Sequence, residues 1–217
     1  MLVTRRAFTA TLSLTGLAAL AGLSPLRLIA DASALSAADV AKPQALPDMA
    51  LGPADAKVTI VEYAAATCLH CAAFNSDVFP KIKSEYIDTG KLRYVFREFP
   101  LNIKDLASSM VARTIARDDS AKYFAVVDIM FKQQDRLVEK TSDTLKLIGR
   151  QAGLGAQAIE DCLKDQAMQD KISAGQKYAE DVLKVAGTPT FFVNGDMIVG
   201  EAAFEEFDKR IKTLLKN

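Results

Sequence analysis

Two stretches of the chain show the two-residue alternation of apolar side chains that predicts β-strands. The first covers residues 57–64, and the second covers residues 92–99 and ends before Pro100. Between them, apolar side chains recur at helical spacing from about Cys68, so we expect one helix to join the two strands. A strand, a helix and a second strand predict a right-handed βαβ unit. One face of the two strands carries Val58, Ile60, Glu62, Leu92, Tyr94 and Phe96.

The pattern from residue 102 to about residue 186 is helical throughout. Apolar side chains form stripes at intervals of three and four residues, and we expect Ser142 to cap one of the helices. Gly153 and Gly155 interrupt the pattern. We therefore predict an inserted all-helical domain over about residues 102–186. The stripes consist of Ala107, Met110, Val111, Thr114, Ile115, Tyr123, Val127, Met130, Leu145, Ile148, Met168, Ile172, Gly175, Ala179 and Val182.

Strand character returns after the helical block. Residues 190–193 and 197–199 are short apolar runs separated by Asn194-Gly195, a dipeptide typical of a type I′ hairpin turn. We expect this hairpin to form an antiparallel edge of the same sheet. A last helix follows, and it could cover one face of the sheet with Phe204, Phe207, Ile211 and Leu214.

The first 32 residues differ from the rest and predict an export signal. Arg5-Arg6 precedes a charge-free stretch, residues 7–26, and small residues that a signal peptidase accepts follow around Ala32. This arrangement indicates a twin-arginine-like signal that is cleaved, and hence a periplasmic protein. Two alternatives stay open: an ordinary Sec signal, and an uncleaved segment that would anchor the protein in the membrane.

Composition limits what residues 33–217 can be. A chain of 217 residues with 27 basic and 27 acidic side chains suits one globular domain with an insertion, and it has no net charge to attract nucleic acid. The chain has three cysteines. Since this number is odd and two of them are only three residues apart, a scaffold of several disulfides is excluded. Export would allow one disulfide to form and persist.

The pair Cys68 and Cys71 is the candidate redox centre, because it lies where the first strand passes into a helix. There Cys68 would face unpaired backbone N–H groups and the positive end of the helix dipole. Such a setting can lower a thiol pKa from about 8.5 to roughly 3.5–7.5. Cys71, one turn further on, would resolve mixed disulfides. His70 lies between the two cysteines, and its positive charge would lower the pKa of Cys68 further.

Other uses of two cysteines at this spacing fit less well. Structural zinc normally needs four Cys or His ligands, and no second pair is present. Attachment of c-type haem needs a histidine directly after Cys71, where the chain has Ala72. A purely structural bridge would close a very short loop and stabilise little. We therefore expect no metal and no bound cofactor, and we retain a Cu(I)-binding dithiol module as an alternative.

Three segments together resemble the DsbA-like thiol–disulfide oxidoreductases of the thioredoxin superfamily. They are Val61-Glu62-Tyr63-Ala64-Ala65-Ala66-Thr67-Cys68-Leu69-His70-Cys71, Gly187-Thr188-Pro189-Thr190-Phe191-Phe192-Val193-Asn194-Gly195 and Ile198-Val199-Gly200. The resemblance runs from about Leu51 to the C-terminus. It implies an α/β fold, specifically a thioredoxin fold with an inserted all-helical domain.

The resemblance also implies roles for four further residues. Pro189 would be a cis proline beside the cysteines, and the backbone of Thr188 would pair with a substrate strand. Leu69, which stands where familiar members have proline, would add apolar surface for substrates. Glu62 would be a buried acid that accepts the proton of Cys71. The alternative is a strand residue facing solvent, but Glu62 is in phase with Val58 and Ile60, which favours a buried position.

These expectations define a periplasmic oxidoreductase that introduces disulfides into exported proteins through Cys68 and Cys71. Its partners would be unfolded, reduced exported proteins and a quinone-linked membrane protein that reoxidises it, as in the family. An isomerase or a reductase on the same fold is the alternative, although residues 33–53 contain no convincing dimerisation segment. We expect Cys162 to be an inert buried thiol on an apolar helix face, with a redox-linked or intermolecular role as its alternative.

Overall fold

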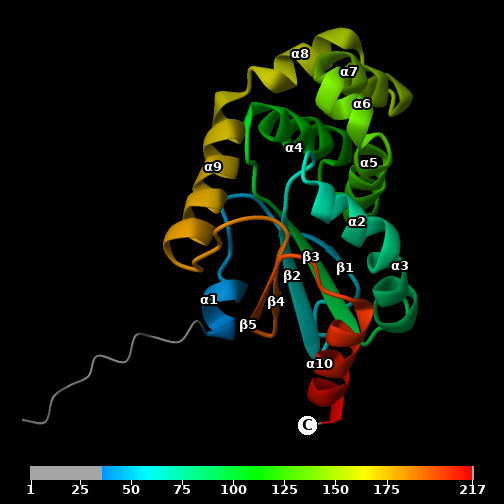
Figure 1. Ribbon diagram of the computed structural model, residues 1–217. Coiled ribbons are helices and arrows are strands. Elements are labelled where there is room, and N and C mark those ends of the chain that lie inside the picture. The colour runs from blue at the N-terminus through cyan, green and yellow to red at the C-terminus, as the bar shows by residue number, and fades with distance from the viewer. Residues whose placement is uncertain (1–35, 217) are drawn as a thin grey trace, which may run out of the picture. The chain divides into compact units, whose positions relative to one another are not determined.

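The computed structural model describes residues 36–216, so the predicted export signal and its cleavage sites lie outside the described residues. The described chain contains a five-stranded sheet with the strand order β1-β3-β2-β4-β5 (Figure 1). The strands are β1 (Met49–Leu51), β2 (Val58–Ala64), β3 (Leu92–Glu98), β4 (Thr190–Val193) and β5 (Asp196–Val199).

The pairing of the strands confirms the sheet predicted from the sequence. β2 and β3 run parallel, with Ile60 opposite Tyr94 and Glu62 opposite Phe96. The other neighbouring strands are antiparallel. Asn194 and Gly195 both have positive φ, 46° and 99°, as a type I′ turn requires. The predicted hairpin therefore forms one edge of the sheet.

The helix expected after β2 is divided into three pieces. α2 (Leu69–Asp77) has Val78 as its C-cap, and α3 (Phe79–Ile82) and a π-helix (Lys83–Ile87) follow. Pro80 is the second residue of α3. Because proline has no N–H, it cannot continue the hydrogen bonds of a preceding helix, but it is tolerated in the first turn of a new one. The continuous helix that we predicted is therefore wrong at this point.

The chain between β3 and β4 is helical, as the pattern predicted, and Figure 1 shows α4 to α8 grouped together above the sheet. Two details of the prediction are wrong. Ser142 lies inside α7, which begins one residue earlier without a side-chain cap, and Val182 follows α9 with 41% of its surface exposed. The helices are α4 (Ile103–Ala116), α5 (Ser120–Lys132), α6 (Gln134–Glu139), α7 (Thr141–Gln151), α8 (Ala156–Leu163) and α9 (Gln166–Asp181), and α10 (Phe204–Lys216) follows the sheet.

Two elements before β2 were not expected. α1 (Ala37–Ala41) begins with a capping box in which the side chains of Ser36 and Asp39 bond each other's backbone N–H. It packs on the hairpin turn so closely that a Cβ at Gly195 would lie 2.9 Å from the nitrogen of Ala37. β1 then extends the sheet by pairing with β3. The segment before β2 is therefore part of the fold rather than a lead to it.

Apolar side chains alternate between the two faces of the sheet, as the period of a strand requires. On one face, Ile60, Tyr94 and Phe191 pack with Phe74 of α2 and Phe207 of α10. The other face carries a second buried cluster. A third cluster fills the helical block and includes both Cys68 and Cys71. Cys68 and Cys71 thus lie where the helical block meets the sheet.

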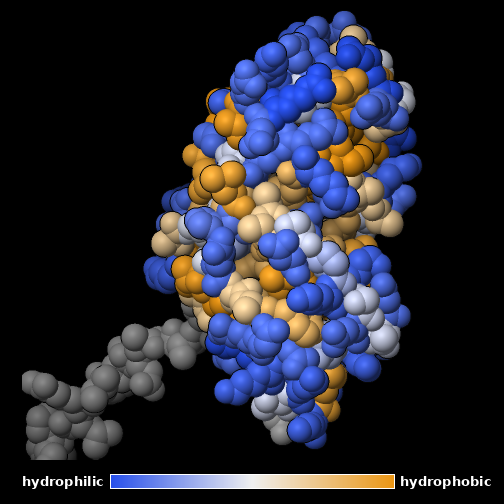
Figure 2. Space-filling model, turned by 45° about the vertical axis from the view of Figure 1, so that its right-hand side comes forward, coloured by the Kyte–Doolittle hydropathy of each residue, from blue (hydrophilic) through white to orange (hydrophobic). Residues whose placement is uncertain are grey.

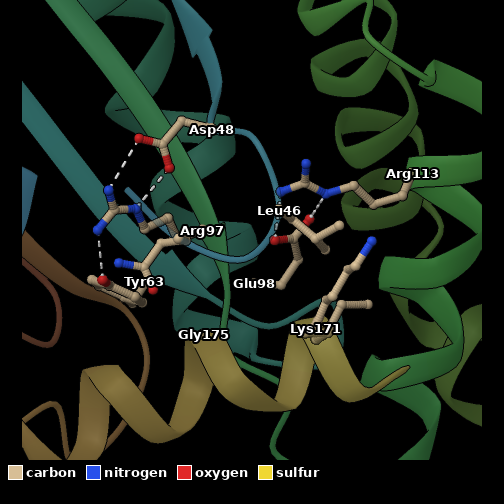
Figure 3. Close-up of a pocket in the computed structure, with 10 residues that line it drawn as sticks. Leu46, Asp48, Tyr63, Arg97, Glu98, Arg113, Lys171 and Gly175 are labelled. Atoms are coloured by element: carbon tan, nitrogen blue, oxygen red, sulfur yellow. Dashed lines mark hydrogen bonds and ion pairs between the residues drawn. The ribbon is translucent and has the colours of Figure 1, made fainter. Parts of the chain in front are cut away.

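A cluster of four charged side chains, three of them buried, joins the segment before β1 to β3 and α4 (Figure 3). Arg97 donates to both oxygens of Asp48 at 2.8 and 3.0 Å. Arg113 donates to both oxygens of Glu98 at 2.5 and 2.8 Å and to the carbonyl of Pro47 at 2.6 Å. The cavity that they help to line has about 20 Å³, room for about one water molecule. Because these four charges are paired, we assign the cluster a structural role.

The surface mixes polar and apolar residues. On the face drawn in Figure 2, apolar residues form patches among polar ones, and hydrophilic residues dominate the lower end of the molecule. Among residues 36–216, no helix combines the length and hydrophobicity needed to cross a membrane.

Candidate active site

Cys68 lies at the predicted junction and is the N-cap residue of α2. Its backbone is extended, with φ −79° and ψ 117°, and its sulfur accepts a hydrogen bond from the backbone N–H of Cys71 at 3.3 Å. Both thiols are free; 8% of the Cys68 surface is exposed, whereas Cys71 is fully buried. Only Cys68 is therefore placed for attack by a large partner.

The two thiols of the pair have very different acidities. The pKa of Cys68 is lowered to about 6, first by a hydrogen bond from the Cys71 thiol and then, against the effect of burial, by Thr188 and the backbone N–H groups of Cys71 and His70. Burial raises the pKa of Cys71 far above its ordinary value. At neutral pH the reduced pair consequently holds a thiolate on Cys68 and a protonated thiol on Cys71.

The loop before β4 brings Thr188 and Pro189 against the pair. The peptide bond between these two residues is cis, as the resemblance implied. The thiol of Cys68 donates to the backbone carbonyl of Thr188 at 3.4 Å. The hydroxyl oxygen of Thr188 is buried and has no hydrogen-bond partner among the described residues. It is available to donate to the sulfur of Cys68 when that sulfur is a thiolate.

Glu62 is buried beneath the pair, so the solvent-facing alternative is wrong. Its side chain is 3% exposed and accepts a hydrogen bond from the hydroxyl of Tyr94 at 2.6 Å. Burial raises the pKa of Glu62 to about 8, although the Tyr94 hydrogen bond opposes this effect. The negative charge of Glu62 in turn contributes to the raised pKa of Cys71. A carboxyl group with a pKa close to neutral can both accept and return a proton.

The side chain of His70 is exposed and pairs with a residue that the sequence did not indicate. Its Nδ1 atom lies 2.5 Å from a carboxylate oxygen of Glu201, in the loop after β5. Glu201 is the main cause of the raised pKa of His70, and the charge of Cys68 adds a smaller contribution in the same direction. The imidazole therefore acts on Cys68 only secondarily, and the backbone N–H of His70 contributes to the lowered pKa of that sulfur.

Two other residues that contact the site lie in the helical block, and the sequence did not predict them. Gln134, at the start of α6, donates to the carbonyls of Ala66 and Cys68. Asp105, in the first turn of α4, accepts from the backbone N–H and the hydroxyl of Thr67. Both are polar residues within amphipathic helices, and nothing in the local pattern distinguishes them from solvent-facing ones.

The remaining sequence candidates have simpler surroundings. Leu69 is 69% exposed, directly beside Cys68. Cys162 is buried in α8, and this burial raises its pKa, which agrees with the expected inert thiol. Within residues 36–216, no group of three His, Cys, Asp or Glu side chains is arranged to hold a metal ion.

This geometry defines a class of protein: a thioredoxin fold with a Cys-x-x-Cys pair at a helix start, facing a cis proline. The family model for thioredoxin matches residues 44–213. A Rickettsia bellii protein named as a protein-disulfide oxidoreductase is 39% identical over 150 residues, which are 68% of this chain and 57% of that protein. Disulfide bond formation protein D of Bacillus subtilis is 26% identical over 170 residues, 76% of each chain.

Solved structures give the same assignment. The crystal structure of Wolbachia pipientis alpha-DsbA1 superimposes with a TM-score of 0.74 and 31% identity, covering 83% of this chain and 96% of that one. The chain belongs to the thioredoxin family and is one of its DsbA-like members. It spans about half the length of the curated Rickettsia relatives that it matches.

Proposed function

We propose that the protein is a thiol–disulfide oxidoreductase that introduces disulfides into exported proteins. The observation that supports this most is the contrast between Cys68, an acidic and partly accessible thiol, and Cys71, a buried one whose pKa is raised. A nucleophile and a resolving thiol need these two properties.

In the proposed reaction the protein starts with a Cys68–Cys71 disulfide. A substrate thiolate attacks the sulfur of Cys68, so a mixed disulfide forms and Cys71 leaves as a thiolate. Glu62 supplies the proton that Cys71 then binds. A second substrate thiolate attacks the substrate sulfur of the mixed disulfide and releases Cys68 as a thiolate. Two electrons thus pass from the substrate dithiol to the protein, and the substrate gains one disulfide.

The acidity of Cys68 favours oxidation of a substrate dithiol over reduction of a substrate disulfide. A thiolate exists only in the reduced protein, so each interaction that stabilises it favours the reduced form over the disulfide form. A pKa of about 6 leaves Cys68 mostly ionised at neutral pH. The disulfide form is then a good oxidant, and Cys68 is a good leaving group in the last step.

Unfolded substrates would bind through backbone pairing at Thr188 and through loose apolar contacts around the cysteines. Leu69, Leu101 and Ile103 are 69%, 51% and 73% exposed. Asn102 donates to the hydroxyl of Thr67 at 3.0 Å, which places the segment 101–103 next to the cysteines. Exposed apolar side chains in such a group commonly mark an interaction surface.

The proposed location and partners follow from the sequence and the family. The export signal predicted over residues 1–32 supports a periplasmic location. After each turnover the protein leaves reduced, so it needs an oxidant, and we propose a quinone-linked membrane protein for this step. No bound cofactor is required, because the electrons are held in the two sulfur atoms.

Refolding assays would test the proposal against its alternatives. An oxidase accelerates disulfide formation in a reduced substrate protein but hardly repairs a scrambled one, and its equilibrium with glutathione indicates an oxidising potential. Faster repair of the scrambled substrate, or a strongly reducing potential, would indicate an isomerase or a reductase instead. Tight stoichiometric Cu(I) binding without dithiol oxidation would indicate the metal-binding module.

A further inference from the structure

The turn between β2 and α2 determines where the sulfur of Cys68 points. We call residues 65–68 the active-site turn; within it, the N–H of Cys68 donates to the carbonyl of Ala65 at 3.2 Å. The sulfur of Cys68, the last residue of this turn, accepts a hydrogen bond from the N–H of Cys71 at 3.3 Å. Interactions that fix the active-site turn therefore bear on the acidity of Cys68.

Gln134 contacts the active-site turn from the helical block. It is the first residue of α6, and its side chain is buried, with 6% of the residue exposed. Its Nε2 atom donates to the carbonyl of Ala66 at 2.8 Å and to the carbonyl of Cys68 at 2.9 Å. A side-chain amide has two N–H donors, so each carbonyl receives one of them.

Asp105 contacts the active-site turn from a second helix of the same block. It is fully buried in the first turn of α4. Its carboxylate accepts the backbone N–H of Thr67 at 2.7 Å and the Thr67 hydroxyl at 3.0 Å. An acid at this helical position often bonds the N–H of its own N-cap residue. Here the carboxylate accepts instead from Thr67 and from the N–H of Leu101.

One peptide group is consequently held at both ends. The carbonyl between Ala66 and Thr67 is bonded to Gln134, and the N–H of the same peptide group is bonded to Asp105. A rotation of this peptide plane would break both hydrogen bonds at once and leave two buried polar groups without partners, which is unfavourable.

We propose that Gln134, together with Asp105, is a positioning residue through which the helical insertion holds the active-site turn and keeps the sulfur of Cys68 against the N–H of Cys71. This role deepens the proposed function and rests on it. Through this role the helical insertion affects the reactivity of Cys68, in addition to any contact that it makes with substrates. The hydrogen bonds that the Gln134 side chain makes go to backbone carbonyls and not to a reacting sulfur, so Gln134 acts through Cys68.

The test measures the acidity of Cys68 when Gln134 loses its donors. In Gln134→Leu the two carbonyls lose their partner while the side chain keeps a similar volume; Gln134→Met, which is unbranched and adapts to its surroundings, is the second variant in case the first does not fold. The thiolate absorbance of the reduced protein is followed against pH in the ultraviolet. Thermal unfolding is recorded for the same samples by circular dichroism.

Two control variants separate positioning from general loss of stability. Gln133→Leu makes the same change one residue away, at a side chain that does not cap α6. Thr144→Val removes a buried hydrogen bond, from the hydroxyl of Thr144 to the carbonyl of Arg136 at 3.1 Å, within the helical block. Neither residue bonds to the active-site turn in the structure, so we expect neither control to change the midpoint of the Cys68 titration.

We expect the titration midpoint of Cys68 to rise by roughly one pH unit in the Gln134 variants, which is roughly a tenfold loss of the thiolate relative to the thiol. The positioning role is wrong if their midpoint equals that of the wild type, whether or not their thermal stability falls as it does in Thr144→Val. A wild-type midpoint near the ordinary value of about 8.5 would contradict the proposed function itself, so the two failures are distinguishable.

Discussion

Replacing Glu62 by glutamine tests whether this carboxylic acid is held protonated in the folded protein. The two side chains have nearly the same shape, and the amide oxygen of glutamine can still accept the hydrogen bond that Tyr94 donates at 2.6 Å. The variant therefore removes the ionisable group and little else. Its effect is expected on the free energy of unfolding and on how that energy depends on pH.

The magnitude follows from the pKa of Glu62, which burial raises from 4.5 to about 8. Between these values the unfolded chain has released a proton that the folded chain keeps, so stability falls as the pH rises through this window and levels off above it. One pKa unit corresponds to about 1.4 kcal/mol. The ionisation of Glu62 therefore lowers the free energy of unfolding by roughly 3 kcal/mol at neutral pH and by roughly 5 kcal/mol above the window, and has almost no effect below it.

The assay is urea unfolding of the reduced protein below, within and above this window. The chain has no tryptophan, so circular dichroism is the suitable signal. When the pH is raised from acidic to neutral, we expect the free energy of unfolding of Glu62→Gln to increase by roughly 3 kcal/mol relative to that of the wild type. Glu160→Gln, at an exposed position on α8, is the matched control and should show no such gain. A difference between Glu62→Gln and the wild type that stays constant with pH would refute the reasoning.

Three further predictions concern the chemistry of the site. Cys71→Ala should accumulate mixed disulfides with disulfide-bonded substrate proteins on non-reducing gels, because the Cys68 thiolate attacks the substrate disulfide, one substrate thiol leaves and no resolving thiol remains; Cys68→Ala should form none, and trapping by Cys68→Ala would reverse the two roles. Thr188→Val should raise the pKa of Cys68 in an ultraviolet titration, because valine lacks the hydroxyl that contributes to lowering it, and an unchanged midpoint would show that this hydroxyl has no effect. His70 is the only histidine of the chain, so its titration by NMR is unambiguous; Glu201→Gln should lower its pKa towards the ordinary value of about 6.5, whereas an unchanged value would mean that the pair does not form in solution.

Much of the fold could be predicted from the sequence, because its central elements depend on local patterns. Strands β2 and β3 have a clear two-residue alternation, and Asn194-Gly195 has turn preferences of its own. β1 was missed because it has only three residues, and what makes it a strand is its pairing with β3. The break at Pro80 could have been predicted, since proline seldom continues a helix.

The sequence predicted those residues of the site that lie close together along the chain. Cys68 and Cys71 lie three residues apart, and Glu62 was found from its phase on the strand together with the family resemblance. Partners from distant elements could not be found in this way. Gln134 bonds to a carbonyl 66 residues away, and Glu201 lies 131 residues from the histidine with which it pairs. Only the folded chain brings these groups together.

Titration of the Cys68 thiol in the reduced wild-type protein tests the central claim most directly. Burial raises the pKa values of Cys71 and Cys162, so both stay protonated while Cys68 titrates, and the oxidised protein serves as the blank. The account predicts that thiolate absorbance is lost on acidification with a midpoint at a pH of about 6. A midpoint near that of a free cysteine, about 8.5, would contradict it.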